Sequence, residues 1–400
     1  MNDVRTAPSP TLVPLALRER LVALRRDLHQ HPELAFAEER TSGVLARELE
    51  RLLPARLDRV AKTGWIARIA GRNPDARAVA IRGDIDALPI QEATGLPFAS
   101  TTAGVMHACG HDVHATWTIG AAALLSETPA EGDVLVVLQP AEEIGEGAAM
   151  VLESGLLDEA GAIFGAHVDR RFPVGQVVAQ AGPLAASADV FEIVLTGRGA
   201  HGARPQESAD PVVCMATLIS ALQTIVSRRV NPASPAVVTV GMVRAGSAPN
   251  VIPDRAVLQG TLRATDHETR ALLHAEVEYI ATHVAAAHRI EASVTFGAGI
   301  PPVVNDAKAS EWAAAAVAGV LGRHALVPLG ITNMAGEDFA WYQRRVPGCF
   351  LRIGARGVED EVIPAHSPRF DVHEDAIVIG AAVLAECARH ASAALARERA

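Results

Sequence analysis

The sequence MHACGHDVH at residues 106–114 places three histidines, a cysteine and an aspartate within nine residues. It follows a short apolar strand that ends in Gly83-Asp84-Ile85-Asp86, and it precedes an apolar run, residues 115–125, with helical spacing. The cluster therefore lies between the end of a strand and the start of a helix, a common position for active sites in α/β sheets. Thiolate and imidazole suit zinc or a similar divalent transition metal. So dense a set of ligands favours a metal site over a chance cluster.

The bulk composition bounds the class of protein. A chain of 400 residues is long for one core, so we expect two domains. The formal net charge of −10, without a basic run, argues against a nucleic-acid surface. The N-terminus lacks an apolar signal core and no apolar run approaches the length of a bilayer span, so we expect a cytoplasmic protein without membrane contact.

The four cysteines are scattered without paired spacing. In a reducing compartment we expect them to be free thiols. Cys214, Cys349 and Cys387 have apolar neighbours and are typical of small core residues. Only Cys109 has polar neighbours that favour a thiolate.

The order of the predicted elements indicates an interrupted domain. Strands alternate with helices up to about residue 167, which favours a three-layer α/β sheet. Residues 189–296 then read as β-α-β-β-α-β, the ferredoxin-like order. After Pro301-Pro302 the first pattern resumes. We therefore predict a catalytic domain of residues 14–185 and 300–400, interrupted by a small α+β insert at residues 186–299.

Two pairs of carboxylates lie at strand ends. Asp84 and Asp86, two residues apart, point the same way, so one of them could orient a ligand imidazole through a hydrogen bond; the alternative is a capped turn. Glu142 and Glu143 directly follow an apolar strand. Adjacent side chains diverge, so one can bind a metal while the other faces a reacting water. An exposed acidic turn is the alternative for this second pair.

Two isolated histidines complete the candidates. His167 ends an apolar strand, and His366 stands between two prolines on a stiff loop that would pre-organise a ligand. Read alone, each is more simply a core or a surface histidine. They become candidate metal ligands only when the other clusters are considered with them.

Taken together, the motifs resemble the aminoacylase and carboxypeptidase superfamily of dinuclear metallopeptidases, peptidase family M20. Within it the chain is most similar to the amidohydrolase branch of hippurate hydrolases, N-acyl-amino-acid amidohydrolases and auxin-conjugate hydrolases. The resemblance covers nearly all of the chain. Its motifs are RRDLHQHPEL at 25–34, RGDIDALPI at 82–90, MHACGHD at 106–112, QPAEE at 139–143, GSAPNVIP at 246–253, GEDF at 336–339 and HSPRF at 366–370.

The resemblance implies a zinc-peptidase-like mixed sheet in the catalytic domain, an inserted ferredoxin-like lid and dimerisation domain, and a centre of two divalent ions. Zinc, manganese, cobalt or nickel would suit the ligands. The general base would be Glu142, which takes a proton from a water activated between the metals. The implied metal ligands are Cys109, His111, Glu143, His167 and His366.

The resemblance also assigns roles within the insert. His201 would reach the active site of a neighbouring subunit and polarise the scissile carbonyl; the alternative is a turn histidine. Asn250 and Arg263 would hold the substrate carboxylate, for which the donor fork of arginine is suited, the alternative for Arg263 being a solvated strand end. A homodimer through the insert follows, with a tetramer as the alternative. Gln206 stands where the family often has a histidine, which puts substrate contacts near that loop in doubt.

The function implied is hydrolysis of the amide bond of an N-acyl amino acid or related conjugate, a small-molecule substrate. One rival is a carboxypeptidase or dipeptidase on the same scaffold, against which the Cys109 motif argues. The other is a metal-binding or ligand-binding protein without activity. Retention of Glu142 beside all five ligand positions argues against that second rival.

Overall fold

The computed structural model describes residues 12–399, and their contacts divide the chain into two compact units. Unit 2 comprises Pro183–Val304 and Ile331–Ala340, and unit 1 comprises the rest of the described chain. The expected insert, residues 186–299, lies within unit 2. The segment 331–340, expected in the other domain, also belongs to unit 2, where Asn333 accepts a hydrogen bond from the Ala186 amide.

Unit 1 is built on a seven-stranded mixed sheet with the strand order β1-β2-β4-β3-β5-β15-β6. The four strands β4, β3, β5 and β15 run parallel, and antiparallel strands flank them on both sides. The strands are β1 (Arg56–Val60), β2 (Gly64–Ile69), β3 (Ala78–Asp84), β4 (Val134–Gln139), β5 (Ala160–Pro173), β6 (Val177–Val178) and β15 (Gly348–Arg356). Every residue of β3 and β4 is buried, so both faces of the central sheet are covered, as expected for an α/β layer structure.

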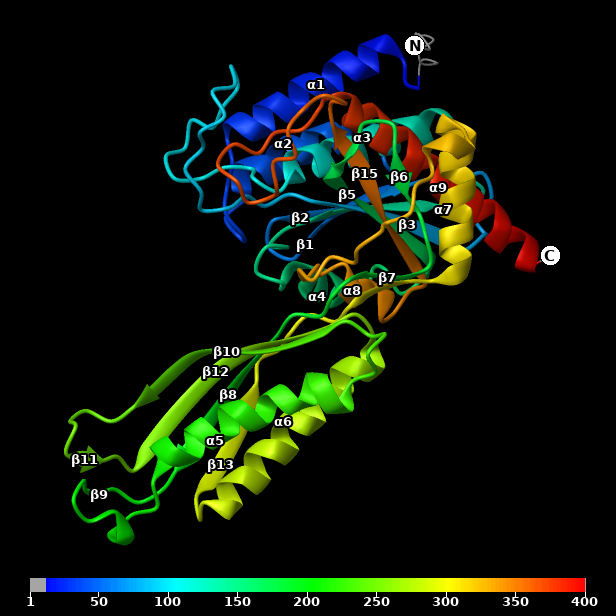
Figure 1. The fold of residues 1–400 in the computed structure, drawn as a ribbon. Coiled ribbons are helices and arrows are strands. Elements are labelled where there is room, and N and C mark those ends of the chain that lie inside the picture. The colour runs from blue at the N-terminus through cyan, green and yellow to red at the C-terminus, as the bar shows by residue number, and fades with distance from the viewer. Residues whose placement is uncertain (1–11, 400) are drawn as a thin grey trace, which may run out of the picture. The chain divides into compact units, whose positions relative to one another are not determined.

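Helices cover this sheet, and α3 lies at the centre of the packing (Figure 1). The helices of unit 1 are α1 (Leu15–Gln30), α2 (Glu39–Glu50), α3 (His111–Glu127), α4 (Gly147–Leu152), α7 (Ala307–Leu321), α8 (Ala340–Gln343, whose first residue belongs to unit 2) and α9 (Asp375–Arg399). Nearly all of α3 is buried, between β3, α1 and α9. Glycines allow this close approach: a Cβ at Gly380 would lie 2.2 Å from the fully buried ring of Trp117. The first turn of α3 is therefore held firmly at the edge of the sheet.

Unit 2 contains a four-stranded antiparallel sheet with the order β10-β12-β8-β13. Its main elements are β8 (Asp189–Thr196), α5 (Pro211–Thr224), β10 (Ala236–Ala245), β12 (Arg255–Ala264), α6 (His267–Ala287) and β13 (Glu291–Phe296). This is the expected β-α-β-β-α-β sequence. Both helices lie on one face of the sheet and enclose a second core (Figure 1). Asp210 and Asp266 cap α5 and α6 by accepting hydrogen bonds from backbone amides of the first turn.

Short elements complete the chain. They are the paired strands β7 (Gly182–Ala185) and β14 (Val303–Asn305), the paired strands β9 (Ala200–His201) and β11 (Val251–Ile252), the 3₁₀ turns at Pro205–Glu207 and Arg323–Ala325, and a π-helical turn at Ile225–Arg229 that continues α5. The α/β class with a mixed sheet is confirmed.

Two helical segments among the described residues are long and apolar enough to cross a membrane by length and composition, Pro211–Arg229 and Asp375–Glu398. The expectation that no run approaches that length was therefore wrong. The second segment is 78% buried within the protein, as in the core helix of a globular fold, and the first is 28% buried. The cytoplasmic location stays a prediction.

Candidate metal centre

The five predicted ligands all belong to unit 1, and the fold brings their donor atoms together. They come from the start of α3, the loop after β4, the middle of β5 and the loop before α9. The donor atoms form overlapping groups, in each of which all atoms lie within 4.8 Å of one another. These groups are Cys109–His111–His167, Cys109–Glu143–His366 and His111–Glu142–Glu143. Cys109 is common to the first two groups.

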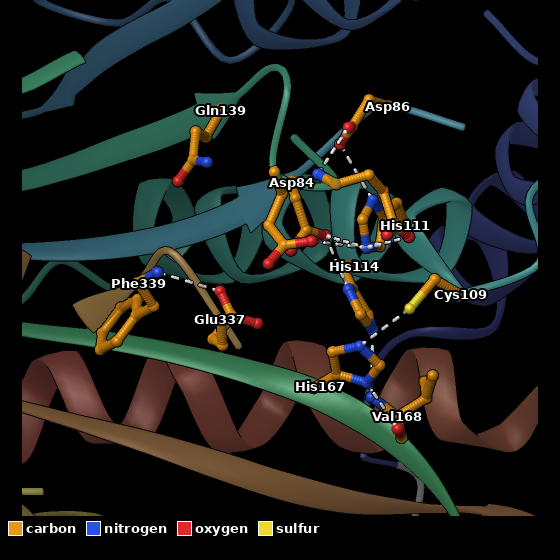
Figure 2. A network of polar contacts seen from close by, with 12 residues as sticks. Asp84, Asp86, Cys109, His111, His114, Gln139, His167, Val168, Glu337 and Phe339 are labelled. Atoms are coloured by element: carbon orange, nitrogen blue, oxygen red, sulfur yellow. Dashed lines mark hydrogen bonds and ion pairs between the residues drawn. The ribbon is translucent and has the colours of Figure 1, made fainter. Parts of the chain in front are cut away.

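The distances between donor atoms fit a shared cation. Cys109 Sγ lies 3.3 Å from His167 Nε2 (Figure 2). His366 Nε2 lies 3.4 Å from Glu143 Oε2, and His111 Nε2 lies 3.8 Å from Glu143 Oε1. Two donors on one tetrahedral zinc, at ligand distances of about 2.0–2.3 Å, stand roughly 3.3–3.6 Å apart. The first two distances fall within that range and the third is slightly longer, so the spacing is close to that of ligands around a metal.

Two buried atoms in the cluster have no hydrogen-bond partner, His111 Nε2 and Glu143 Oε1. Leaving such atoms unpaired in the interior costs on the order of 1–3 kcal/mol each, and more for a charged carboxylate. A cation between them removes that cost. The donor set, one sulfur with imidazoles and carboxylates, is one that transition metals accept, so the residues present fit a metal centre.

Hydrogen bonds aim the ligand atoms into the cluster. Asp86 Oδ1 accepts from His111 Nδ1 at 3.0 Å, and Asp86 Oδ2 accepts from the Glu143 amide at 3.0 Å, so this carboxylate orients two ligands (Figure 2). His167 Nδ1 donates to the Val168 carbonyl at 2.7 Å. In both imidazoles Nδ1 therefore carries a proton, and Nε2 is the atom directed at the cluster, where His167 Nε2 accepts from the Cys109 thiol in the absence of a metal. Asp84, the other predicted orienting carboxylate, contacts His114 instead, at 2.6 Å.

Unusual backbone conformations place the ligands. Gly110, which separates Cys109 from His111, has φ +91°, and a Cβ there would lie 2.5 Å from Val168 Cγ2. Ala141, which precedes the two glutamates, has φ 55°, and His366 itself has φ 66°. Left-handed conformations of this kind in residues other than glycine cost roughly 1–3 kcal/mol and cluster at functional sites. The surrounding structure therefore holds the ligand loops in conformations that they would not adopt alone.

Hydrogen bonds keep these strained loops in place. The His366 amide donates to the Ala108 carbonyl at 2.7 Å. The Ala141 amide donates to Glu38 Oε1 at 3.0 Å, and Thr63 Oγ1 donates to Glu38 Oε2 at 2.7 Å. Glu38 was not among the predicted site residues, because nothing in its local sequence links it to the loop 103 residues later.

Cys109 lies in surroundings that favour its neutral thiol, so it needs a nearby cation to become a thiolate. Burial and the negative charge of Glu143 raise the pKa of the Cys109 thiol far above its ordinary value. Burial lowers the pKa of His167 well below its ordinary value, and that imidazole is neutral, as a metal ligand must be. The hydrogen bond to Glu143 raises the pKa of His366. Metal binding at this cluster therefore releases a proton from Cys109 and is favoured by rising pH.

Substitution of Cys109 by serine is expected to weaken zinc binding, because a hydroxyl replaces a thiolate. Loss of a residue that only hydrogen-bonds to a metal ligand costs roughly 10–100-fold in metal affinity, and loss of the ligand itself should cost more. Competition with a chromogenic chelator measures the affinity. Cys214→Ser is the matched control, since Cys214 is buried in the core of unit 2, and it should bind zinc as the parent does. Equal zinc affinity of the Cys109→Ser variant and the parent would exclude Cys109 as a ligand.

A buried ion-pair network anchors the start of α3 behind the cluster. Asp112, which follows His111, accepts from Arg25 Nε and from His29 Nδ1, each at 2.8 Å. The other nitrogen of His29 lies 3.3 Å from Glu92 Oε1. Burial opposes protonation of His29, but the charge of Asp112 and the hydrogen bonds to Asp112 and Glu92 outweigh it and raise the pKa of His29 to about 9. Nothing in the local sequence of the motif at 25–34 indicates this contact with Asp112.

The raised pKa of His29 predicts a pH dependence of stability. Asp112 and Glu92 face this imidazole as anions and Arg25 opposes its charge, while burial lowers the pKa of the neighbouring His107 to about 4 and keeps that ring neutral. A group with a raised folded pKa stabilises fully below its unfolded pKa of about 6.5 and loses that contribution as the pH rises through about 9. The unfolding free energy should therefore fall by roughly 3 kcal/mol more in the parent than in His29→Gln between pH 6.5 and 9.5. Denaturant titrations at both pH values measure it, and an unchanged difference between the two proteins would contradict it.

The candidates in unit 2 are divided between two places. His201 on β9 pairs with Val251 on β11, and the Asn250 carbonyl accepts from the Gly202 amide, so His201 and Asn250 share one exposed ribbon. Arg263 lies near the far end of β12, about eight residues beyond Arg255, which at roughly 3.3 Å per residue is about 26 Å. Within one chain the structure therefore does not bring Asn250 and Arg263 together. Gln206 is exposed in the 3₁₀ turn Pro205–Glu207.

Comparison with known proteins supplies a context for this geometry. The model of peptidase family M20/M25/M40 matches residues 80–390. The N-acetylcysteine deacetylase of Bacillus subtilis is 44% identical over 380 residues, which cover 93% of this chain and 97% of that protein. The IAA-amino acid hydrolase ILR1-like 2 of Arabidopsis thaliana is 40% identical, over 92% of this chain and 84% of its own length.

A solved structure is also similar. The YXEP protein of Bacillus subtilis, described as a dinuclear metal-binding peptidase of family M20, superimposes with a TM-score of 0.83 at 39% identity, covering 96% of this chain and 99% of its own. The likeness thus extends over both units of the described structure.

Proposed function

This chain belongs to peptidase family M20/M25/M40, and from that premise we propose that it is a metal-dependent amidohydrolase of N-acyl amino acids or related amino-acid conjugates. The observation that carries the proposal is the buried pair of unpartnered donors, His111 Nε2 and Glu143 Oε1, beside Glu142 in a cluster of thiol and imidazole ligands. The substrate class is supported by relatives named for deacetylation of N-acetylcysteine and for hydrolysis of an IAA-amino acid conjugate.

The chain's residues would hold two divalent ions. The groups Cys109–His111–His167 and Cys109–Glu143–His366 outline two positions that share the cysteine sulfur. When bound, such ions polarise a carbonyl and lower the pKa of a coordinated water. Sulfur and imidazole favour zinc, and manganese, cobalt or nickel suit the same ligands.

Glu142 is proposed as the general base. It adjoins the ligand Glu143, and its Oε2 lies 3.9 Å from His111 Nε2, so its carboxylate stands at the edge of the cluster. It would take a proton from the attacking water and return that proton to the leaving amine, which lets one residue serve both halves of the reaction.

His201 is proposed to donate a hydrogen bond to the scissile carbonyl oxygen as that oxygen gains negative charge. The Ala203 amide donates to His201 Nδ1 at 3.1 Å, so in the neutral ring the proton is on Nε2. The exposed side chain therefore presents an N–H donor away from its own ribbon.

The separation of Asn250 from Arg263 supports an active site built from two subunits. We assign His201 and Asn250 of one subunit to the site of its partner, and we propose that Arg263 binds the substrate carboxylate through its donor fork. A homodimer through unit 2 is the corresponding assembly. The exposed apolar side chains Val212, Val213 and Val226 on α5 and its π-helical extension support it.

A substrate panel tests the proposed function. The metal-loaded protein should hydrolyse N-acetyl and N-benzoyl amino acids with a kcat/KM at least about tenfold above that for dipeptides of the same amino acids, a difference of about 1.4 kcal/mol in transition-state binding. Dipeptides as the better substrates would identify a dipeptidase instead. Absence of metal-dependent turnover on the whole panel would overturn the assignment as an enzyme of this class.

A further inference from the structure

His114 is the third histidine of the motif at residues 106–114, and the proposed mechanism gives it no role. It lies three residues after His111 on α3, so both imidazoles project from the same side of the helix. It is completely buried, and its ring stacks on Trp117 with centroids 4.7 Å apart. Its ring centroid is 4.5 Å from that of the ligand His167. His114 could be read as a metal ligand, because Asp84, His111 and His114 form a further group of residues whose ligand atoms lie close together.

The hydrogen bonds of His114 use both of its nitrogens. The Val168 amide donates to His114 Nε2 at 3.0 Å, and His114 Nδ1 lies 2.6 Å from Asp84 Oδ1 (Figure 2). A backbone amide can only donate, so Nε2 is the acceptor and the ring proton is on Nδ1, where it is donated to Asp84. The lone pair that a metal would need is therefore occupied by the chain's own backbone.

The Val168 amide needs this acceptor because of where the strands end. β3 pairs with β5 from Ala78 opposite Ala160 to Arg82 opposite Gly165, and no pair follows. Val168 lies beyond that last pair, where an unpaired buried amide would cost roughly 1–3 kcal/mol. The His114 ring replaces the missing strand carbonyl at the point where β5 delivers His167 to the site.

Val168 in turn fixes the ligand. Its amide is bound by His114, and its carbonyl accepts from His167 Nδ1 at 2.7 Å. The peptide groups on both sides of the Val168 Cα therefore link the two histidines. Rotation of this segment would turn the His167 ring away from Cys109.

The support behind His114 is rigid. Gly83 allows α3 to approach β3 closely, since a Cβ there would lie 2.6 Å from the His114 carbonyl oxygen. Asp84 also accepts from the buried Arg82, whose Nε donates to Gln139 Oε1 at 2.8 Å. Gln139 ends β4, four residues before Glu143. The hydrogen-bonded chain thus runs from the end of β4 through β3 and α3 to Val168 in the middle of β5.

We propose that His114 is a positioning residue for the metal ligand His167, which it holds in place by accepting the Val168 amide while Asp84 fixes its tautomer. The proposal rests on the metal centre of the proposed function, and it assigns His114 to the protein scaffold rather than to the ligand set.

Nuclear magnetic resonance of ¹⁵N-histidine-labelled protein loaded with ¹¹³Cd distinguishes the roles. We expect ¹¹³Cd–¹⁵N coupling at His111 Nε2 and His167 Nε2, no coupling at His114, and an Nδ1-protonated neutral His114 ring before and after loading. Coupling at His114, or a proton on its Nε2 in the metal-free protein, would overturn this role alone. Absence of coupling at every histidine would overturn the metal centre as well.

Three substitutions test the position of the acceptor. Glutamine can place an oxygen near the Nε2 position, asparagine reaches only as far as Nδ1, and phenylalanine fills the volume without polar atoms. His114→Gln should keep zinc affinity within a few-fold of the parent, whereas His114→Asn and His114→Phe should lose roughly 10–100-fold, the usual cost of an outer hydrogen-bond partner. Affinity is measured by chelator competition on protein that circular dichroism shows to be folded. Equal losses in the glutamine and asparagine variants would overturn the role of the Nε2 acceptor.

Discussion

Replacement of Glu142 by glutamine is expected to lower kcat by about 10²–10⁴-fold, the usual contribution of a general base, while two metal ions stay bound. Glutamine keeps the size of the side chain and removes its ability to accept a proton. Glu142 borders the cluster without a position in the two groups that share Cys109, so its loss should leave metal content unchanged.

Steady-state kinetics on an N-acetyl amino acid, with elemental analysis of the same preparations, measure both effects. Glu146→Gln is the matched control, because Glu146 is exposed only four residues away from Glu142, and it should behave as the parent. Glu143→Gln should instead lose metal as well as activity. If Glu142→Gln keeps more than about a tenth of the parental kcat, the general base has been misassigned.

Replacement of His201 by alanine is expected to lower kcat by roughly 10²–10³-fold, as loss of a donor to the developing oxyanion does, without a change in metal content. The stronger result comes from mixing inactive subunits. When Glu142→Gln and His201→Ala proteins exchange subunits, each mixed dimer holds one site with both defects and one site with neither. A 1:1 mixture should recover about a quarter of parental activity, since half of the dimers are mixed and half of their sites are intact.

A matched mixture controls this experiment. Glu142→Gln combined with Cys109→Ser should recover nothing, because both changes lie in unit 1 and leave every site of a mixed dimer defective. Native mass spectrometry establishes that subunits have exchanged. No recovery in the first mixture despite complete exchange would mean that His201 serves its own chain or has no part in catalysis.

Local patterns in the sequence predicted much of the structure. The β-α-β-β-α-β order expected over residues 189–296 is observed, and β8 and β12 alternate in burial because each strand has one face on the core of unit 2 and the other away from it. Cys109, His111 and Glu143 stand beside the ends of a helix and a strand, where turn residues and apolar runs mark the boundaries, whereas the strand expected to end at His167 continues to Pro173. Their convergence in unit 1 follows from the parallel order of β4, β3 and β5.

What the sequence did not predict depends on distances between strands that lie far apart along the chain. His114 supports β5 only because β3 stops pairing with β5 at Gly165. The contact of Glu38 with Ala141 joins two loops that no local motif connects. The separation of Asn250 from Arg263 reflects the length of β12, so two residues expected to bind one carboxylate cannot do so from one chain.

Stepwise metal reconstitution tests whether turnover requires two metal ions per subunit. Metal-free protein is titrated with zinc or manganese, and bound metal per subunit is measured beside turnover of an N-acetyl amino acid at each step. We expect no turnover without metal and maximal turnover only when two ions are bound per subunit. Full turnover in the metal-free protein, or saturation of turnover at a single ion, would contradict it.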